Sequence, residues 1–100
     1  MTKLHTTPFD GAKYIRTPDD VLDTLNDALD SGEAGYIAAA LGAIARSEGM
    51  TMIAEKSGVK RQALYRSLSE DGNPTLETLL GVLSAMNLQL AVKESEAKAA

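Results

Sequence analysis

Apolar residues recur every three or four positions through most of the chain, which is the spacing of one buried face of an α-helix. Five segments show this pattern, and each is bounded by residues that favour helix ends. They run from Pro18 to a stop at Ser31-Gly32, then over about 33–47, 51–57, 61–68 and 76–86. The sequence therefore predicts an all-α domain of five helices.

The first of these helices has the clearest start. Thr17 can accept a hydrogen bond from the first turn, and Pro18 suits the first helical position. The carboxylates of Asp19 and Asp20 favour the positive end of the helix dipole. Gly32, Gly49 and Gly58 are the predicted stops of the first three helices, and Thr75 is the predicted cap of the last.

The apolar stripes of three helices predict which side chains face the core. In the first helix they are Val21, Leu22, Leu25, Ala28 and Leu29. In the second they are Tyr36, Ile37, Ala40, Leu41 and Ile44, with Gly42 and several alanines keeping the other side slim for close helix contact. In the last they are Leu76, Leu79, Leu80 and Leu83.

Near the C-terminus the period changes from helical spacing to two. Leu88, Leu90 and Val92 alternate with residues that are polar or small, which predicts a short strand. At the other end, Phe9 to Ile15 carries three large apolar residues and predicts a short helical turn. Residues 1–8 are expected to form a flexible leader and residues 94–100 a disordered tail.

Composition narrows the class of protein. A length of 100 residues suits one domain, and 44% apolar residues is a globular value. The absence of cysteine excludes disulfides and cysteine-based zinc sites. No apolar run reaches membrane-spanning length, and the first six residues lack the apolar region of a signal peptide. We therefore expect a cytoplasmic protein without a membrane partner.

Charge is distributed unevenly, although the formal net charge is only −4. Residues 10–33 hold seven acidic and two basic side chains, a net charge of −5, whereas residues 46–66 hold five basic and two acidic ones, a net charge of +3. An acidic half and a basic half in one chain indicate two different partners. The alternative is that these are ordinary solvated helix surfaces.

Residues 50–68 meet the steric needs of a helix-turn-helix. Ala54 supplies a small residue where the second helix would cross the first, and Gly58 permits a left-handed turn four residues later. Val59 fills the space beneath that turn, and Leu64 is buried five positions on. Ile53 and Leu68 complete this small core.

The second helix of this motif then exposes side chains suited to DNA. Arg61 and Gln62 lie in its first turn, the part that enters the major groove, where Arg can bond guanine and Gln adenine. Lys60, Tyr65 and Arg66 are better placed for phosphates. The alternative reading is an ordinary helix with exposed polar residues.

From Ile53 to Leu88 the chain resembles the lambda-repressor/Cro-like (Xre) family. The resemblance rests on the segments Ile-Ala-Glu-Lys-Ser-Gly-Val, Leu-Tyr-Arg and Gly-Asn-Pro-Thr-Leu-Glu-Thr-Leu. It implies a five-helix lambda-repressor-like helix-turn-helix domain, here with an N-terminal helical extension. Gly49-Met50 and Lys60 stand where that family usually has Ser-Gln and a Ser/Thr cap, residues that often contact phosphate.

A second resemblance covers residues 9–92. Over this range the chain is similar to the addiction module antidote proteins, a HigA-like antitoxin group. The resemblance rests on Phe9-Asp10, Ala40-Leu41-Gly42, Gly49-Met50, Gly58-Val59, Leu64-Tyr65 and Gly72-Asn73-Pro74. It implies a type II antitoxin that neutralises a small basic toxin of the RelE/ParE superfamily (HigB-like). It also implies repression of its own operon through operator DNA, without a cofactor.

The resemblance and the charge map together divide the domain of residues 9–93. Residues 9–47 form the acidic helices, 50–68 the helix-turn-helix, and 75–93 the last helix and the strand. Complementary potential would draw a basic toxin to the acidic helices. The expected contacts are Asp19, Asp20, Asp23, Asp27 and Asp30. Helix-turn-helix proteins usually read two half-sites, so a homodimer is also expected.

Three other classes compete with an antitoxin. A stand-alone phage-type repressor fits the motif equally well, but the acidic N-terminal helices disfavour it. A purely structural helical module would leave the basic helix face unexplained. An enzyme is disfavoured because the chain shows no catalytic constellation, metal-ligand cluster or phosphate-binding loop, and its one histidine, His5, lies in the leader.

Overall fold

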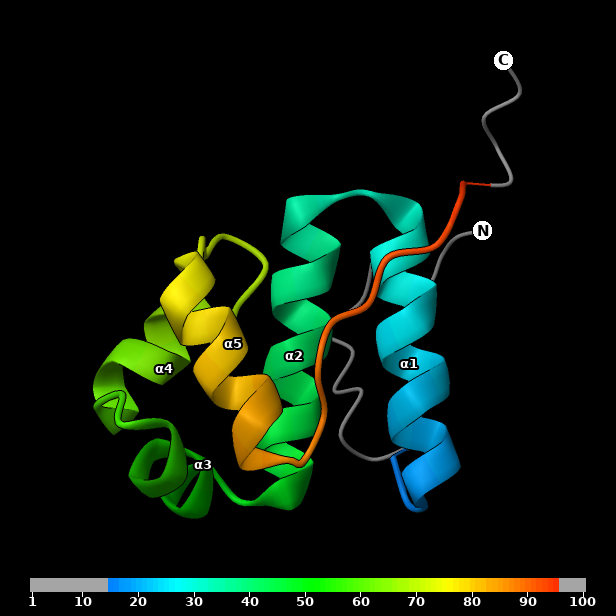
Figure 1. Cartoon of the computed structure of the whole chain (residues 1–100). Helices are drawn as coiled ribbons and strands as arrows, with labels where there is room; N and C mark the ends of the chain where they lie inside the picture. The colour runs from blue at the N-terminus through cyan, green and yellow to red at the C-terminus, as the bar shows by residue number, and fades with distance from the viewer. Residues whose placement is uncertain (1–14, 96–100) are drawn as a thin grey trace.

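The computed structural model describes residues 15–95, and five α-helices follow one another along them (Figure 1). These are α1 (Pro18–Ser31), α2 (Ala34–Glu48), α3 (Met50–Ser57), α4 (Arg61–Ser67) and α5 (Leu76–Ala85). All five helices predicted from the sequence are present, and each end lies within one residue of its predicted position. The predicted leader, the tail from residue 96 and most of the turn at Phe9–Ile15 lie outside the described residues.

Local sequence sets the ends of these helices as predicted. Thr17 caps α1 by accepting a hydrogen bond from the Asp20 backbone N–H at 3.1 Å. Gly32 ends the helix in the left-handed region at φ 70°, where a side chain would be strained. Thr75 caps α5 in the same way as Thr17 caps α1, by accepting from the Thr78 N–H at 3.0 Å.

Helix α2 is the centre of the fold. Helix α1 packs along one side of it to form a helical hairpin, and α3 and α4 contact it on the side away from α1 (Figure 1). Helix α5 packs mainly on α3. The most completely buried large side chains come from α2, α3, α4, α5 and the residue after α4, and they are Leu41, Ile44, Ile53, Leu64, Leu68, Val82 and Leu83.

Four residues predicted to face the core are instead exposed. On α5, Leu76 is 66% exposed and Leu80 is 45% exposed, while Val82, Leu83 and Ala85 are buried. The prediction was wrong for these two leucines because α5 packs on α3 through a face rotated toward Val82, which keeps Leu83 inside and turns Leu76 and Leu80 outward. On α2, Tyr36 is 43% exposed, since it lies in the first turn, before the helix enters the core. In α1, Leu22 of the predicted stripe is likewise exposed.

The predicted C-terminal strand is not formed in the part of the chain that the structure describes. After α5 the chain turns at Asn87, whose φ is 62°, and then runs extended to residue 95. Leu88 packs partly on the core, but Val92 is fully exposed. The alternation is real, but residues 15–95 contain no second strand that could pair with this segment.

No single helix among residues 15–95 is long and apolar enough to cross a membrane. Helices α2 and α3 reach the required length and apolarity only as a pair, and a bend of 107° separates them. Both contribute to the buried core, with Leu41, Ile44 and Ile53 fully enclosed.

Candidate functional site

Helix α4 presents one face to the core and the other to solvent. Leu64 is completely buried and Leu68, just after the helix, is 2% exposed, as the sequence predicted. Because these two residues fix the inward side, Arg61, Gln62, Tyr65 and Arg66 are all left exposed. Lys60, the residue that precedes the helix, is exposed as well. The five side chains predicted to contact DNA therefore share one accessible helix and its cap.

The turn before α4 has the geometry expected from the sequence. Gly58 adopts φ 78°, and its N–H donates to the Ala54 carbonyl at 3.0 Å, which ends α3. The Ser57 hydroxyl then accepts a hydrogen bond from the Val59 N–H at 3.2 Å. Val59 is half-buried against the core, and Ile53 is completely buried. A tight connection of this kind leaves α4 little freedom to move relative to α3.

The exposed side of α4 is positively charged. The helix contains Arg61 and Arg66, Lys60 precedes it, and no acidic residue lies within it. The Arg61 guanidinium carbon lies 5.6 Å from the centre of the Tyr65 ring, and Arg61 Nη2 donates to Tyr65 Oη at 3.4 Å. Sequence reasoning did not predict this pairing, although a spacing of four residues on a helix is the spacing that brings side chains together.

The acidic face lies on α1, which holds five aspartates and no basic residue. Asp19, Asp23, Asp27 and Asp30 are exposed. Asp20 serves the helix itself, because its carboxylate accepts from the backbone N–H groups of Arg16 at 2.9 Å and Thr17 at 3.0 Å. These two bonds favour the ionised carboxylate and lower the pKa of Asp20.

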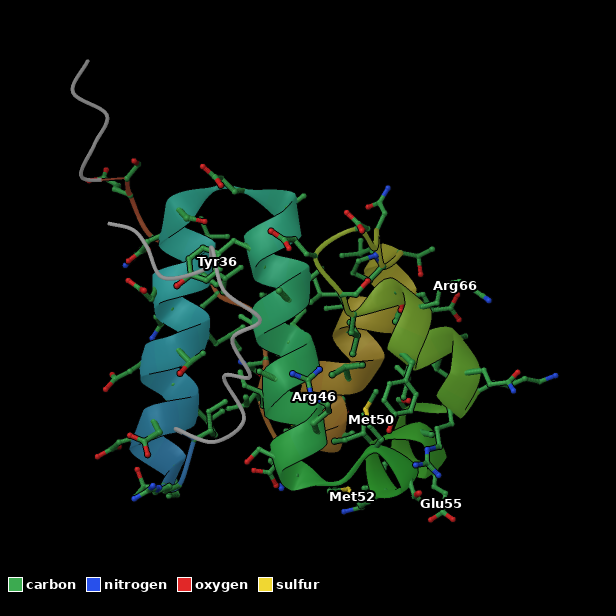
Figure 2. The ribbon with its side chains drawn as sticks, turned by 180° about the vertical axis from the view of Figure 1, so that it is seen from behind. Tyr36, Arg46, Met50, Met52, Glu55 and Arg66 are labelled. Atoms are coloured by element: carbon green, nitrogen blue, oxygen red, sulfur yellow. The ribbon has the colours of Figure 1, made fainter. Side chains whose placement is uncertain are left out.

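Two residues outside α1 engage this acidic face. The Tyr36 hydroxyl donates to Asp27 Oδ2 at 2.9 Å, and this bond raises the pKa of Tyr36 because only the protonated hydroxyl can donate it. Figure 2 shows Tyr36 on α2 beside α1. Lys93, in the extended segment, pairs with Asp30 at 3.4 Å. The pairing of Tyr36 follows from the helical hairpin, whereas nothing in the sequence indicated that of Lys93.

Comparison with known proteins identifies the family. A family model described as "Probable addiction module antidote protein" matches residues 5–94. The chain belongs to this family. An uncharacterized protein of Haemophilus influenzae is similar to this antidote-family chain, with 39% identity over 87 residues, which are 87% of this chain and 90% of the relative. No solved structure matches the chain significantly.

Membership of the antidote family supports an antitoxin role and implies a toxin partner. The antidote family is not a class of enzymes. Among residues 15–95, no three His, Cys, Asp or Glu side chains are grouped so that they could hold a metal ion. The features of this antidote-family chain that need an explanation are therefore its two charged surfaces.

These two surfaces lie on opposite sides of the antidote-family fold. Helix α2 separates α1 from α4, and Figure 2 shows Arg66 on the side remote from α1, with Tyr36 beside α1. The acidic and basic faces are thus accessible from different directions. A partner bound to one face therefore need not collide with a partner bound to the other.

Proposed function

We propose that this protein is the antitoxin of a type II toxin–antitoxin pair and the repressor of its own operon. It neutralises a small basic toxin of the RelE/ParE superfamily and binds operator DNA through a lambda-repressor-like helix-turn-helix formed by α3 and α4. Family membership supports the antitoxin role. The observation that carries the DNA-binding role is the exposed basic face of α4, held in place by the buried Leu64.

For DNA, the proposal assigns α4 to the major groove. Arg61 and Gln62 lie at the N-terminal end of the helix, the part of such helices that reaches base edges. Arg61 would bond guanine and Gln62 adenine, each through two parallel hydrogen bonds. Lys60 and Arg66 would contact phosphates on either side and would set the salt dependence of binding.

For the toxin, the proposal assigns the acidic face of α1. Five aspartates on 14 residues without a basic side chain create a strong negative potential. A basic protein that binds RNA carries the complementary potential, which speeds encounter and favours this orientation. Asp19 and Asp23 are the best contacts, because Asp20 caps the helix, Asp27 accepts from Tyr36 and Asp30 pairs with Lys93.

Operator binding would involve a homodimer in the cytoplasm. One α4 helix covers only a few base pairs, and two-fold symmetric operators are read by two such helices about one helical turn of DNA apart. A dimer also doubles the number of basic side chains that contact phosphates, which raises both the affinity for DNA and its salt dependence.

Binding to the DNA upstream of its own gene tests the DNA-binding role. The purified protein should bind this fragment more tightly than unrelated DNA of equal length, with a steep loss of affinity as salt rises. Lys60→Ala/Arg66→Ala should lower the affinity for both DNAs and reduce the slope against salt. Lys93→Ala removes a positive charge far from α4 and is the control, which should bind as the wild type does.

Two outcomes would contradict the assignment. Equal binding to the upstream fragment and to unrelated DNA would exclude a specific operator. Unchanged salt dependence in Lys60→Ala/Arg66→Ala would exclude α4 as the surface that contacts phosphate.

A further inference from the structure

Tyr65 occupies an unusual place on the exposed face of α4. It is an aromatic residue with 46% of its surface exposed, and it lies between the cations of a helix proposed to enter DNA. The sequence alone predicted that Tyr65 contacts a phosphate. In the structure, both its ring and its hydroxyl contact Arg61, one helical turn earlier.

The contact between the two residues has two components. The Arg61 guanidinium lies 5.6 Å from the ring centre, within the range of a cation–π interaction, and its Nη2 donates to the Tyr65 hydroxyl at 3.4 Å. Within residues 15–95 no carboxylate forms a salt bridge with Arg61, so the tyrosine is its principal partner there. The ring therefore restricts a long side chain that would otherwise sample many rotamers.

This restriction matters for base recognition. A free arginine loses rotamer entropy when it is fixed against a base, and that loss reduces affinity and discrimination. An arginine already held by an aromatic ring loses less, and its planar fork keeps the orientation needed for two parallel bonds. Arg61 is the first residue of α4, where the proposed groove contact is made.

We propose that Tyr65 is a positioning residue that holds the Arg61 guanidinium ready to read a base pair, rather than a phosphate contact. The inference rests on the proposed DNA-binding function. It makes Tyr65 a determinant of specificity that acts through Arg61. Removing Tyr65 should consequently weaken the discrimination at the base pair read by Arg61 and leave general DNA affinity nearly unchanged.

The test combines Tyr65→Leu, Tyr65→Phe and Arg61→Ala in a double-mutant cycle. Dissociation constants are measured on the upstream fragment, on unrelated DNA, and on fragments with single base-pair substitutions that locate the pair read by Arg61. Tyr65→Leu should weaken operator binding about 3- to 10-fold, and binding to unrelated DNA less than about twofold. Tyr65→Phe keeps the ring face and should have a smaller effect. In the Arg61→Ala background, Tyr65→Leu should add nothing.

Each other result has a distinct meaning. If Tyr65→Leu and Tyr65→Phe weaken both DNAs equally, and additively with Arg61→Ala, the hydroxyl contacts a phosphate and the inference is wrong. If neither variant changes discrimination while the wild type binds its operator, the inference fails but the proposed function stands. If the wild type binds no DNA, both fail. Unchanged circular dichroism of the variants shows that the exposed site was altered without loss of fold.

Discussion

The carbonyl oxygen of Leu68 lies directly over the backbone of Gly42. A Cβ atom on Gly42 would come within 2.1 Å of that oxygen, a separation that real structures do not allow. Because Leu68 follows α4 immediately, this approach sets how closely α4 sits on α2. The orientation of the proposed DNA-reading helix therefore depends on a glycine in the central helix.

Gly42→Ala should destabilise the protein by about 1–3 kcal/mol or more, because α4 must move away from α2 to admit the methyl group. The expected loss runs against helix propensity, which favours alanine over glycine inside a helix by up to about 1 kcal/mol. Urea unfolding followed by circular dichroism measures the change.

Gly81→Ala is the matched control for this prediction. Gly81 is also inside a helix, but its added Cβ would lie 3.2 Å from the Ser57 carbonyl oxygen, which needs a shift of only a few tenths of an ångström. Its stability should stay within about 1 kcal/mol of the wild type. Equal effects of the two substitutions would contradict the assigned role of Gly42.

Thr17 and Asp20 form a capping box at the start of α1, in which each side chain accepts a hydrogen bond from the other residue's backbone N–H. This capping box predicts a pH-dependent contribution to stability. The pKa of Asp20 is lower in the folded protein than its usual value of 3.8. Its stabilising effect is therefore complete above pH 3.8 and is lost as the pH falls through the lowered pKa. In urea unfolding, the wild type should have a larger free energy of unfolding than Asp20→Asn at pH 7. This difference should shrink in acid.

Thr17→Ala provides the companion measurement for that cap. Removing the hydroxyl that accepts from the Asp20 N–H should cost about 1 kcal/mol at neutral pH. A difference between wild type and Asp20→Asn that stays constant from pH 7 into acid would show that the carboxylate does not cap the helix in solution.

The two faces of α5 should respond differently to truncation. Leu83 is 2% exposed, so Leu83→Ala should cost about 2–5 kcal/mol of unfolding free energy through lost burial and a cavity. Leu76 is 66% exposed, and Leu76→Ala should change stability by about 0.5 kcal/mol or less. Thermal unfolding of both variants at low protein concentration compares the two losses of stability. A larger loss in Leu76→Ala than in Leu83→Ala would mean that α5 packs through its other face.

On α4, substitutions of Arg61 and Lys60 should have different effects, one on sequence specificity and the other on general affinity for DNA. Arg61→Ala should cost about 1–3 kcal/mol on the operator and relax the preference at one base pair. Lys60→Ala should weaken operator and unrelated DNA alike, with a shallower salt dependence. Competition binding with base-pair substitutions measures both effects, and an unchanged site preference in Arg61→Ala would overturn its assignment as a base reader.

Local signals were sufficient to predict the helices of this chain and much of the candidate site. Thr17, Gly32, Gly58 and Thr75 act within a few residues of themselves, so their roles could be predicted from neighbours alone. The burial of Leu64 likewise followed from helical spacing, and it exposed the basic side chains of α4.

The sequence predictions that failed concern features that depend on tertiary packing. The leucines of α5 cover more than one side of the helix, and only packing against α3 decides that Leu83 is buried while Leu76 and Leu80 are exposed. The alternation at Leu88–Val92 predicted a strand, but a strand needs a partner that residues 15–95 do not supply. The contact between Lys93 and Asp30 joins distant parts of the chain without any shared sequence pattern.

The acidic face of α1 is the surface through which we propose that this antidote-family chain neutralises a toxin. The most direct test expresses the small open reading frame adjacent to this gene, with and without the protein, and measures growth and co-purification. The reversal variant is Asp19→Lys/Asp23→Lys, and the control is Glu55→Lys/Glu77→Lys, which makes the same charge change on α3 and α5.

We expect the neighbour to arrest growth, and the wild type and the control to restore growth in a stable complex. The α1 reversal variant should fail to rescue while still binding operator DNA. A harmless neighbour with no complex would contradict the antitoxin role and leave a stand-alone repressor. Rescue by the reversal variant would contradict the assignment of the toxin to α1.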